Sequence, residues 1–213
     1  MSEFEMLIVA ATEREASPFR ERGSAVVVSG VGKVNAAIVS SLAIAGRPDS
    51  TVLISVGVAG SLPGPDAPTI GDLVIGAVSV SAEDGMATPE GFVPIDEMGF
   101  PLARGARSGR FPADPDVLKW VRALMPDVRC GSIATVSTCS GTDEAAQQVV
   151  DRTGAIAEAM EGVGVLQAAC QLGVPAIEIR AISNTTGRRD AQVWDLEAGC
   201  EALSALADAL ARA

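Results

Sequence analysis

The sequence predicts an α/β fold: a single domain over residues 1–213, built of three layers, α/β/α, with helices on both faces of a central sheet. Three observations predict it. Short runs rich in Val and Ile alternate with helical patterns. The runs are apolar almost throughout, as in strands that are buried on both faces. With 213 residues, 48% of them hydrophobic and 20% charged, the chain has the size and composition of one globular domain.

Six apolar runs predict strands over 6–10, 25–29, 52–58, 73–80, 132–136 and 176–182, and a further short strand precedes Met160. Helical patterns cover 34–45, 115–125, 142–153, 162–172 and 196–213. In the first of these helices, apolar residues recur at helical spacing at Val34, Ala37, Ile38, Leu42 and Ala45. Glycines end two of the helices, Gly46 directly and Gly173 with Pro175 close behind it.

The segment 81–112 lacks such patterns and is rich in Gly and Pro, so we expect a long loop that belongs to the active site. It contains three of the five phenylalanines, Phe92, Phe100 and Phe111. Two interpretations are open: the rings pin the loop to the core, or they line a pocket.

The net charge of −11 makes nucleic acid and anionic membrane surfaces poor partners. The chain has no histidine, which excludes catalysis by an imidazole base and zinc bound through histidine. The spacing of the four cysteines suggests no metal site. No apolar stretch is long enough to span a membrane and no basic leader is visible, so a cytoplasmic protein is expected.

Several polar or glycine-rich segments directly follow predicted strands, where α/β sheets bind ligands. Thr12 and Glu15 form the T-x-x-E pattern of a helix capping box, which is compatible with a second role for Glu15 in orienting a water. The stretch 29–35 contains a G-x-G turn, but Asn35 and Val34 break the dinucleotide and Walker patterns. The stretch 55–61 is a turn of small residues that offers no Arg or His for phosphate.

Charged residues also interrupt apolar stretches near the end of the chain. Glu158 and Glu161 are either solvated on a surface turn or buried with a partner, and the flanking apolar residues favour burial of Glu161. Arg180 and Glu178 suggest an internal ion pair, with each other or with Glu158. Asn184 follows at the end of that strand, as a ligand contact or as a turn residue.

Four stretches, taken in order, resemble the landmarks of the purine nucleoside phosphorylase and nucleosidase superfamily. They are Ala11 to Glu15, the G-V-G-K-V stretch from Gly30, Met160-Glu161-Gly162 and Arg180-Ala181-Ile182-Ser183. Within it, the stretches 12–15, 88–92, 135–138, 158–162 and 191–196 are most similar to the futalosine hydrolase family, which serves menaquinone biosynthesis. The resemblance implies a central mixed, twisted sheet, a nucleoside substrate, no cofactor and no metal, and a homo-oligomer of two or more chains.

The resemblance also implies roles. Glu15 matches the carboxylate that activates water, and Met160 and Glu161 match the pair that holds the ribose. Asn184 stands where methylthioadenosine nucleosidases have an Asp that protonates the purine, and Val58 where they have a Ser. Because an amide donates hydrogen bonds to O6 and N7, Asn184 favours hypoxanthine over adenine.

The remaining expected contacts lie around these residues: Val136, Ser137, Gly60, Phe92, Phe100, Trp194 and Arg188. Two arginines follow Asn184, and two interpretations are open: Arg188 or Arg189 meets the carboxylate of futalosine, or both are solvated turn residues. The alternatives are a methylthioadenosine or adenosylhomocysteine nucleosidase, a purine nucleoside phosphorylase, and a nucleoside-binding module without chemistry.

Overall fold

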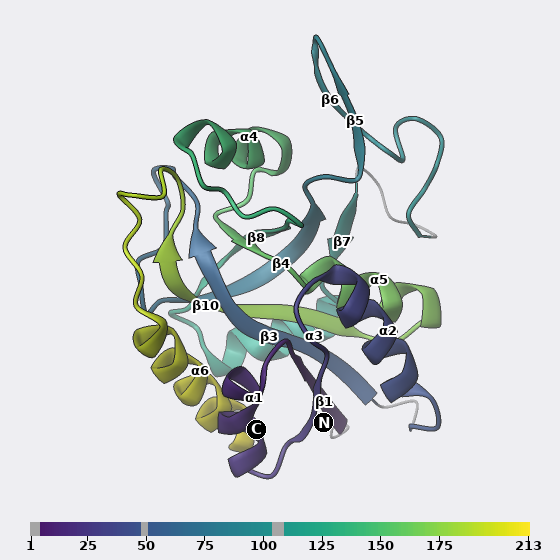
Figure 1. Cartoon of the computed structure of the whole chain (residues 1–213). Helices are drawn as coiled ribbons and strands as arrows, with labels where there is room; N and C mark the ends of the chain where they lie inside the picture. The colour runs from purple at the N-terminus through teal and green to yellow at the C-terminus, as the bar shows by residue number, and fades with distance from the viewer. Residues whose placement is uncertain (1–4, 48–50, 104–108) are drawn as a thin grey trace.

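The computed structural model describes residues 5–47, 51–103 and 109–213 and shows an α/β/α arrangement (Figure 1). Its main sheet contains the strands β1 Glu5–Ala10, β2 Ala25–Val28, β3 Thr51–Ser61, β4 Leu73–Ser81, β7 Arg110–Pro112, β8 Arg129–Thr135, β9 Ala157–Ala159 and β10 Ala176–Thr185. The helices are α1 Glu13–Glu21, α2 Lys33–Ile44, α3 Pro115–Leu124, α4 Asp143–Thr153, α5 Gly162–Leu172 and α6 Leu196–Ala211. All six predicted strands and all five predicted helices are confirmed, with small shifts at their ends.

The sheet is mixed, as the family resemblance implies. The strands β2, β1, β3 and β10 run parallel to one another, whereas β4 pairs antiparallel with β10 and β9 pairs antiparallel with β3. The order is β10-β4-β8-β9-β3-β1-β2, and β10 also pairs with β3. The long strand β3 therefore has β10 along one edge, and first β1 and then β9 along the other.

Two cores separate the three layers, because alternate residues of each strand point to opposite faces. Ile8 and Ala10 of β1 pack with α1, α3 and α6, whereas Leu7 and Val9 pack with α2 and α5. In Figure 1, α2 and α5 lie together on one side of the sheet and α1 and α6 on the other. No helix within the described ranges is both long enough and apolar enough to cross a membrane.

Helix α2 presents its apolar stripe outward. Only Ala36 and Ser40 of this helix are buried, where it packs closely on α5, whereas Val34, Ile38 and Leu42 are 67%, 54% and 72% exposed. Helical periodicity thus predicted the helix correctly, but the face that packs against the rest of the chain is the face of small residues.

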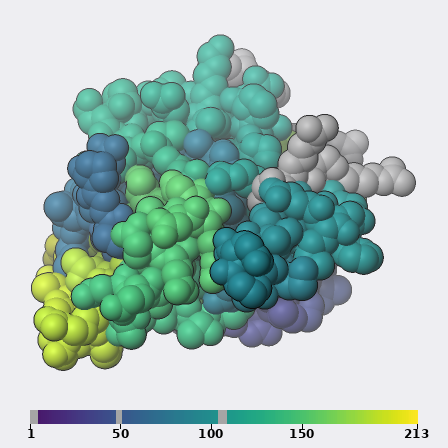
Figure 2. All heavy atoms as spheres, turned by 90° about the horizontal axis from the view of Figure 1, so that it is seen from above, coloured from purple at the N-terminus to yellow at the C-terminus, as the bar shows by residue number. Residues whose placement is uncertain are grey.

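The segment 81–112 is more regular than predicted. Strands β5 Gly85–Thr88 and β6 Gly91–Pro94 form an antiparallel hairpin, and β7 pairs with β4; residues 104–108 lie outside the described residues. Figure 2, which looks onto this end of the molecule, shows the dark-teal hairpin beside the green surface of α4. Arg152 of α4 lies 4.6 Å from the centre of the Phe92 ring and joins the two.

Candidate active site

A cavity of about 510 Å³ opens at the carboxyl ends of β1, β3 and β10, where parallel strands of α/β sheets present their ligand-binding residues. Its wall also includes residues of the β8–α4 loop, the β9–α5 junction and the segment between β10 and α6. Three glutamates, Glu15, Glu158 and Glu161, line it and are each at most 6% exposed.

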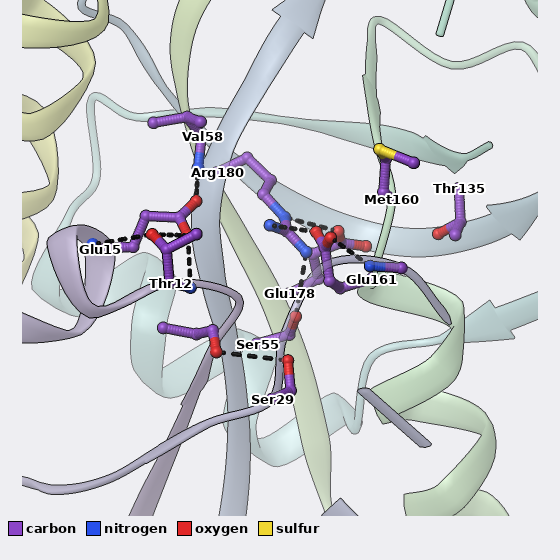
Figure 3. Close-up of polar contacts among 12 residues, drawn as sticks. Thr12, Glu15, Ser29, Ser55, Val58, Thr135, Met160, Glu161, Glu178 and Arg180 are labelled. Atoms are coloured by element: carbon purple, nitrogen blue, oxygen red, sulfur yellow. Dashed lines mark hydrogen bonds and ion pairs between the residues drawn. The ribbon is translucent and has the colours of Figure 1, made fainter. Parts of the chain in front are cut away.

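Glu15 caps helix α1 and reaches across to β3. Both halves of the predicted capping box are present: the Thr12 hydroxyl accepts from Glu15 N, and Glu15 Oε2 accepts from Thr12 N at 3.0 Å and from its hydroxyl at 2.7 Å. The other oxygen, Oε1, accepts from Val58 N at 2.9 Å (Figure 3). Since a carboxylate has about four acceptor positions, one remains for a water molecule.

Gly57 allows this approach. A Cβ atom there would lie within 2.6 Å of Glu15 Oε1 and would also collide with the Arg180 guanidinium. The predicted turn over 55–61 is wrong, because β3 continues to Ser61, and the glycine within this strand lets Glu15 and Arg180 converge on it from two different elements.

Arg180 is fully buried and fixes the second carboxylate. Its Nη1 donates to Glu161 Oε2 at 3.2 Å, its Nε to Glu178 Oε1 at 2.8 Å and its Nη2 to the Ser55 hydroxyl at 3.2 Å (Figure 3). The predicted pairing of Arg180 with Glu178 is confirmed, and the further partner is Glu161 rather than Glu158.

Arg180 is the cation that the carboxylates of this cluster share. Burial raises the pKa of Glu178 above its usual range, against the opposing effects of Arg180 and the Ser79 hydroxyl. Burial alone would lower the pKa of Arg180, but Glu178, Glu161 and Glu15 outweigh it and raise that pKa. The guanidinium therefore stays charged and holds Glu161 at the cavity wall.

The G-x-G turn positions the same carboxylate from the other side. Glu161 Oε1 accepts from Gly32 N at 2.9 Å, and the next residue, Lys33, forms an ion pair with Asp84 at 2.7 Å. Lys33 and the Ser81 hydroxyl together lower the pKa of Asp84, although its partial burial acts in the opposite direction. The turn thus positions a cavity-facing carboxylate, a role that its weak sequence pattern did not predict.

Asn184 lines the cavity with its amide oriented by its neighbours. The Ser183 hydroxyl donates to Asn184 Oδ1 at 2.9 Å, and Asn184 Nδ2 donates to the Thr185 carbonyl at 3.0 Å. Because Nδ2 carries two hydrogens and donates one of them to the Thr185 carbonyl, one hydrogen remains for a ligand.

Glu158 belongs to the wall without a cationic partner among the described residues. Its two oxygens accept from Ser140 N at 2.8 Å and from the Ser140 hydroxyl at 2.6 Å. Burial raises its pKa, although both Ser140 bonds act in the opposite direction.

The structure brings together most of the residues singled out in the sequence. The cavity wall includes the three residues predicted to be catalytic, Glu15, Glu161 and Asn184. It also includes four of the predicted contacts: Met160, Val136, Gly60 and Trp194. Four others lie away from it: Phe92, Phe100, Ser137 and Arg188.

These four positions have other surroundings. Phe92 packs under Arg152 in the hairpin, Phe100 is 64% exposed, and the amide of Ser137 donates to Glu83 at 2.6 Å. Arg188 is exposed and pairs with Asp190 at 3.0 Å. The long loop therefore brings no aromatic ring to this cavity, and Phe111 is buried in the core instead.

The wall also includes two arginines, of which Arg189 was a candidate in the sequence and Arg14 was not. Arg14 and Arg189 both line the cavity, and Arg189 lies over the Trp194 ring at 5.0 Å. Gln192 accepts from both Arg189 and Trp194 and donates to the carbonyls of Ser140 and Gly187. Of the two consecutive arginines, Arg189 is thus the one within reach of an anionic substituent on a ligand.

Comparison with known proteins places the chain in a family. The family model described as the phosphorylase superfamily matches residues 19–213. The chain is 37% identical to futalosine hydrolase of Streptomyces coelicolor, covering 87% of this chain and 76% of that protein. It is 39% identical to futalosine hydrolase of Thermus thermophilus, over 86% and 78% respectively.

More distant similarity extends over the same fold. The chain is 27% identical over 75% of its length to 5'-methylthioadenosine/S-adenosylhomocysteine nucleosidase of Mycobacterium tuberculosis, which it covers to 68%. The solved futalosine hydrolase of Helicobacter pylori superposes with a TM-score of 0.77 at 19% identity, over 97% of both chains. The length of the family match and the identity to these relatives show that the chain belongs to the phosphorylase superfamily.

Proposed function

We propose that this protein hydrolyses the N-glycosidic bond of futalosine and releases hypoxanthine. The identity of 36–39% to three futalosine hydrolases supports the substrate. Two buried carboxylates, Glu15 and Glu161, and the amide of Asn184 around one cavity support the reaction.

The observation that favours hydrolysis rather than phosphorolysis is the hydrogen bond from Val58 N to the carboxylate of Glu15. The N–H of Val58, at the cavity end of β3, would otherwise be available to donate to an anion such as phosphate. Here the carboxylate of Glu15 takes that donor and adds a negative charge beside it. Water, which is neutral and can donate a proton to Glu15, fits this position better than phosphate.

The reaction then follows from the geometry. Cleavage leaves positive charge on the ribose ring and negative charge on the departing purine. Glu161, fixed by Gly32 and Arg180, accepts hydrogen bonds from the ribose hydroxyls, and Met160 packs beside the sugar. Glu15 accepts the proton of the attacking water, and the carboxylates of the wall stabilise the cationic ribose.

Asn184 acts on the leaving group. Its remaining amide hydrogen donates to the N7 and O6 edge of the purine and stabilises the charge that develops there, as preorganised donors do. The 6-oxopurine of futalosine has an acceptor at each of these positions, so the one remaining hydrogen meets an acceptor at either.

Futalosine should be hydrolysed at a rate that does not depend on phosphate. The measurement is release of free base from futalosine, inosine and methylthioadenosine, each with and without phosphate. Formation of a sugar 1-phosphate would instead indicate a phosphorylase. Preferred cleavage of methylthioadenosine would indicate the nucleosidase activity named for the more distant relatives. Binding of a nucleoside without release of its base would indicate a nucleoside-binding module without chemistry.

The family resemblance implies a homo-oligomer, and we also propose that two copies of the chain associate through α2. The stripe of Val34, Ile38 and Leu42 is the exposed apolar face of this helix, and the hydrophobic effect favours covering such a face. Leu42→Asp should therefore convert a dimer to a monomer in sedimentation velocity. Gln148→Asp, an exposed change on α4, is the control and should leave the dimer intact. A wild-type monomer, or a dimeric Leu42→Asp variant, would contradict this interface.

The cytoplasmic location and the role in menaquinone biosynthesis expected from the sequence stay predictions. Measurement of menaquinone in cells that lack the gene tests the pathway, and fractionation of cells tests the location.

A further inference from the structure

Lys33 and Asp84 form an ion pair near the cavity that takes part in no step of the mechanism above. Lys33 Nζ donates to both carboxylate oxygens of Asp84, at 2.8 and 2.7 Å, and the two side chains are 23% and 31% exposed. Neither residue lines the cavity. A pair that is largely shielded from water is held more firmly than one between two exposed side chains, which usually contributes little.

The ion pair lies next to the less firmly held of the two supports of Glu161. Arg180, which donates to Oε2 of this carboxylate, is fully buried and is fixed in turn by Glu178 and Ser55. The other support is the N–H of Gly32, the residue at which α2 begins without a side-chain cap. A Cβ atom at Gly32 would meet no atom of the described residues within 4 Å, its chain neighbours apart. The position of this N–H therefore depends on what holds the next residue.

Asp84 anchors that next residue, Lys33, to the central sheet. It comes three positions after Ser81, the last residue of β4, and the Ser81 hydroxyl donates to its carboxylate. The backbone between them is fixed as well, because Ala82 is fully buried and its N donates to the carbonyl of Thr135 in β8 at 3.1 Å. The hairpin β5–β6, which projects from the top of the molecule in Figure 1, starts directly after Asp84. The ion pair thus ties the start of α2 to the ends of two strands.

We infer that Asp84 is a positioning residue for recognition of the ribose: through Lys33 it holds the G-x-G turn so that the N–H of Gly32 stays on Glu161. This inference rests on the proposed function, from which the ribose-binding role of Glu161 is taken. Asp84 itself touches no substrate. Without the ion pair, the turn is free to move and Glu161 keeps only its support from Arg180. Binding of the ribose hydroxyls then weakens, while the contacts to the base remain.

The experiment compares futalosine with its 2′,3′-dideoxy form, which lacks the hydroxyls that Glu161 would bind. Asp84→Asn should lower kcat/KM for futalosine by about 10- to 100-fold, the range for a displaced hydrogen bond to a charged group, and change that for the dideoxy form little. Lys33→Met should do the same. The double variant should be no worse than either single variant, because all three lack the same pair. Asp208→Asn, which breaks the pair with Arg22 away from the cavity, is the control and should affect neither substrate.

The ratio of the two substrates decides the outcome. A ratio that falls in Asp84→Asn and in Lys33→Met supports the inference. A ratio that stays at the wild-type value in either folded variant overturns it, because equal losses on both substrates indicate a merely structural pair. Losses that multiply in the double variant also overturn it. If one single variant fails to fold, the other still gives the ratio.

Failure of the proposed function gives a different result. If the wild-type protein cleaves neither compound, the proposed function is wrong, and titration calorimetry with the same two nucleosides then gives the ratio from binding alone. Tighter binding of the ribose form that is lost in Asp84→Asn supports the inference even then. Equal binding of the two compounds by the wild type, or no binding of either, overturns it.

Discussion

Glu15→Gln should lower kcat for futalosine by ~10²–10⁴-fold, the usual contribution of a general base, while KM changes little. The amide has nearly the shape of the carboxylate but cannot accept the proton of the attacking water. Single-turnover release of hypoxanthine measures the chemical step, and binding of hypoxanthine shows whether the cavity is intact.

The same substitution also weakens a helix cap, so stability must be measured beside activity. The Glu15 carboxylate accepts from Thr12 and from Val58 N, and a glutamine has only one acceptor oxygen for these donors. We expect a loss of about 1 kcal/mol in the free energy of unfolding, as for other lost caps. Glu13→Gln on the same helix is the control, because Glu13 is exposed and pairs with Arg20 on the surface. A Glu15→Gln enzyme with near wild-type kcat would reduce Glu15 to a structural cap.

The Asn184→Asp enzyme should lose activity on futalosine. Its activity on the 6-amino counterpart of futalosine should rise relative to its activity on futalosine. The carboxylate presents lone pairs to O6 and N7, and it also faces the Thr185 carbonyl, to which Asn184 Nδ2 now donates. Each mispaired group costs on the order of 1–3 kcal/mol, so the ratio of kcat/KM for the two substrates should shift by ~10–100-fold.

The ratio of the two substrates is the decisive number, because a general loss of folding would lower both rates together. Thr185→Val is a useful comparison, since it keeps the carbonyl that Asn184 contacts and removes only the hydroxyl that accepts from Val193 N. It should leave the ratio unchanged. An unchanged ratio in Asn184→Asp would show that the amide does not select the base.

The fold class could be predicted because its signals are local. Strand–helix alternation, the capping box at Thr12 and Glu15, and glycines after helices depend on residues a few positions apart. The short strands β5, β6 and β7 were missed, because three or four residues in a glycine-rich segment give no period to detect.

Burial of a helix face illustrates the limit of such patterns. Periodicity marked Val34, Ile38 and Leu42 as one face of α2, but it could not say what that face contacts. Packing against α5 decides which face of α2 is buried. Helix α5 contacts the side of the small residues Ala36 and Ser40, so the larger apolar residues are exposed.

The sequence by itself determined the α/β class, the absence of imidazole chemistry and the identity of the polar residues that follow strands β1, β9 and β10. Only the tertiary structure decided which of them meet. Arg180 pairs with Glu178 and Glu161 and not with Glu158. Arg189 lines the cavity, whereas Arg188 pairs with Asp190. Neither Phe92 nor Phe100 lines the cavity. The physical reason is that contacts across the sheet depend on strand order and register. Gly60 brings Glu158 and Asn184, 26 positions apart in the chain, to either side of one strand, and no local pattern encodes that pairing.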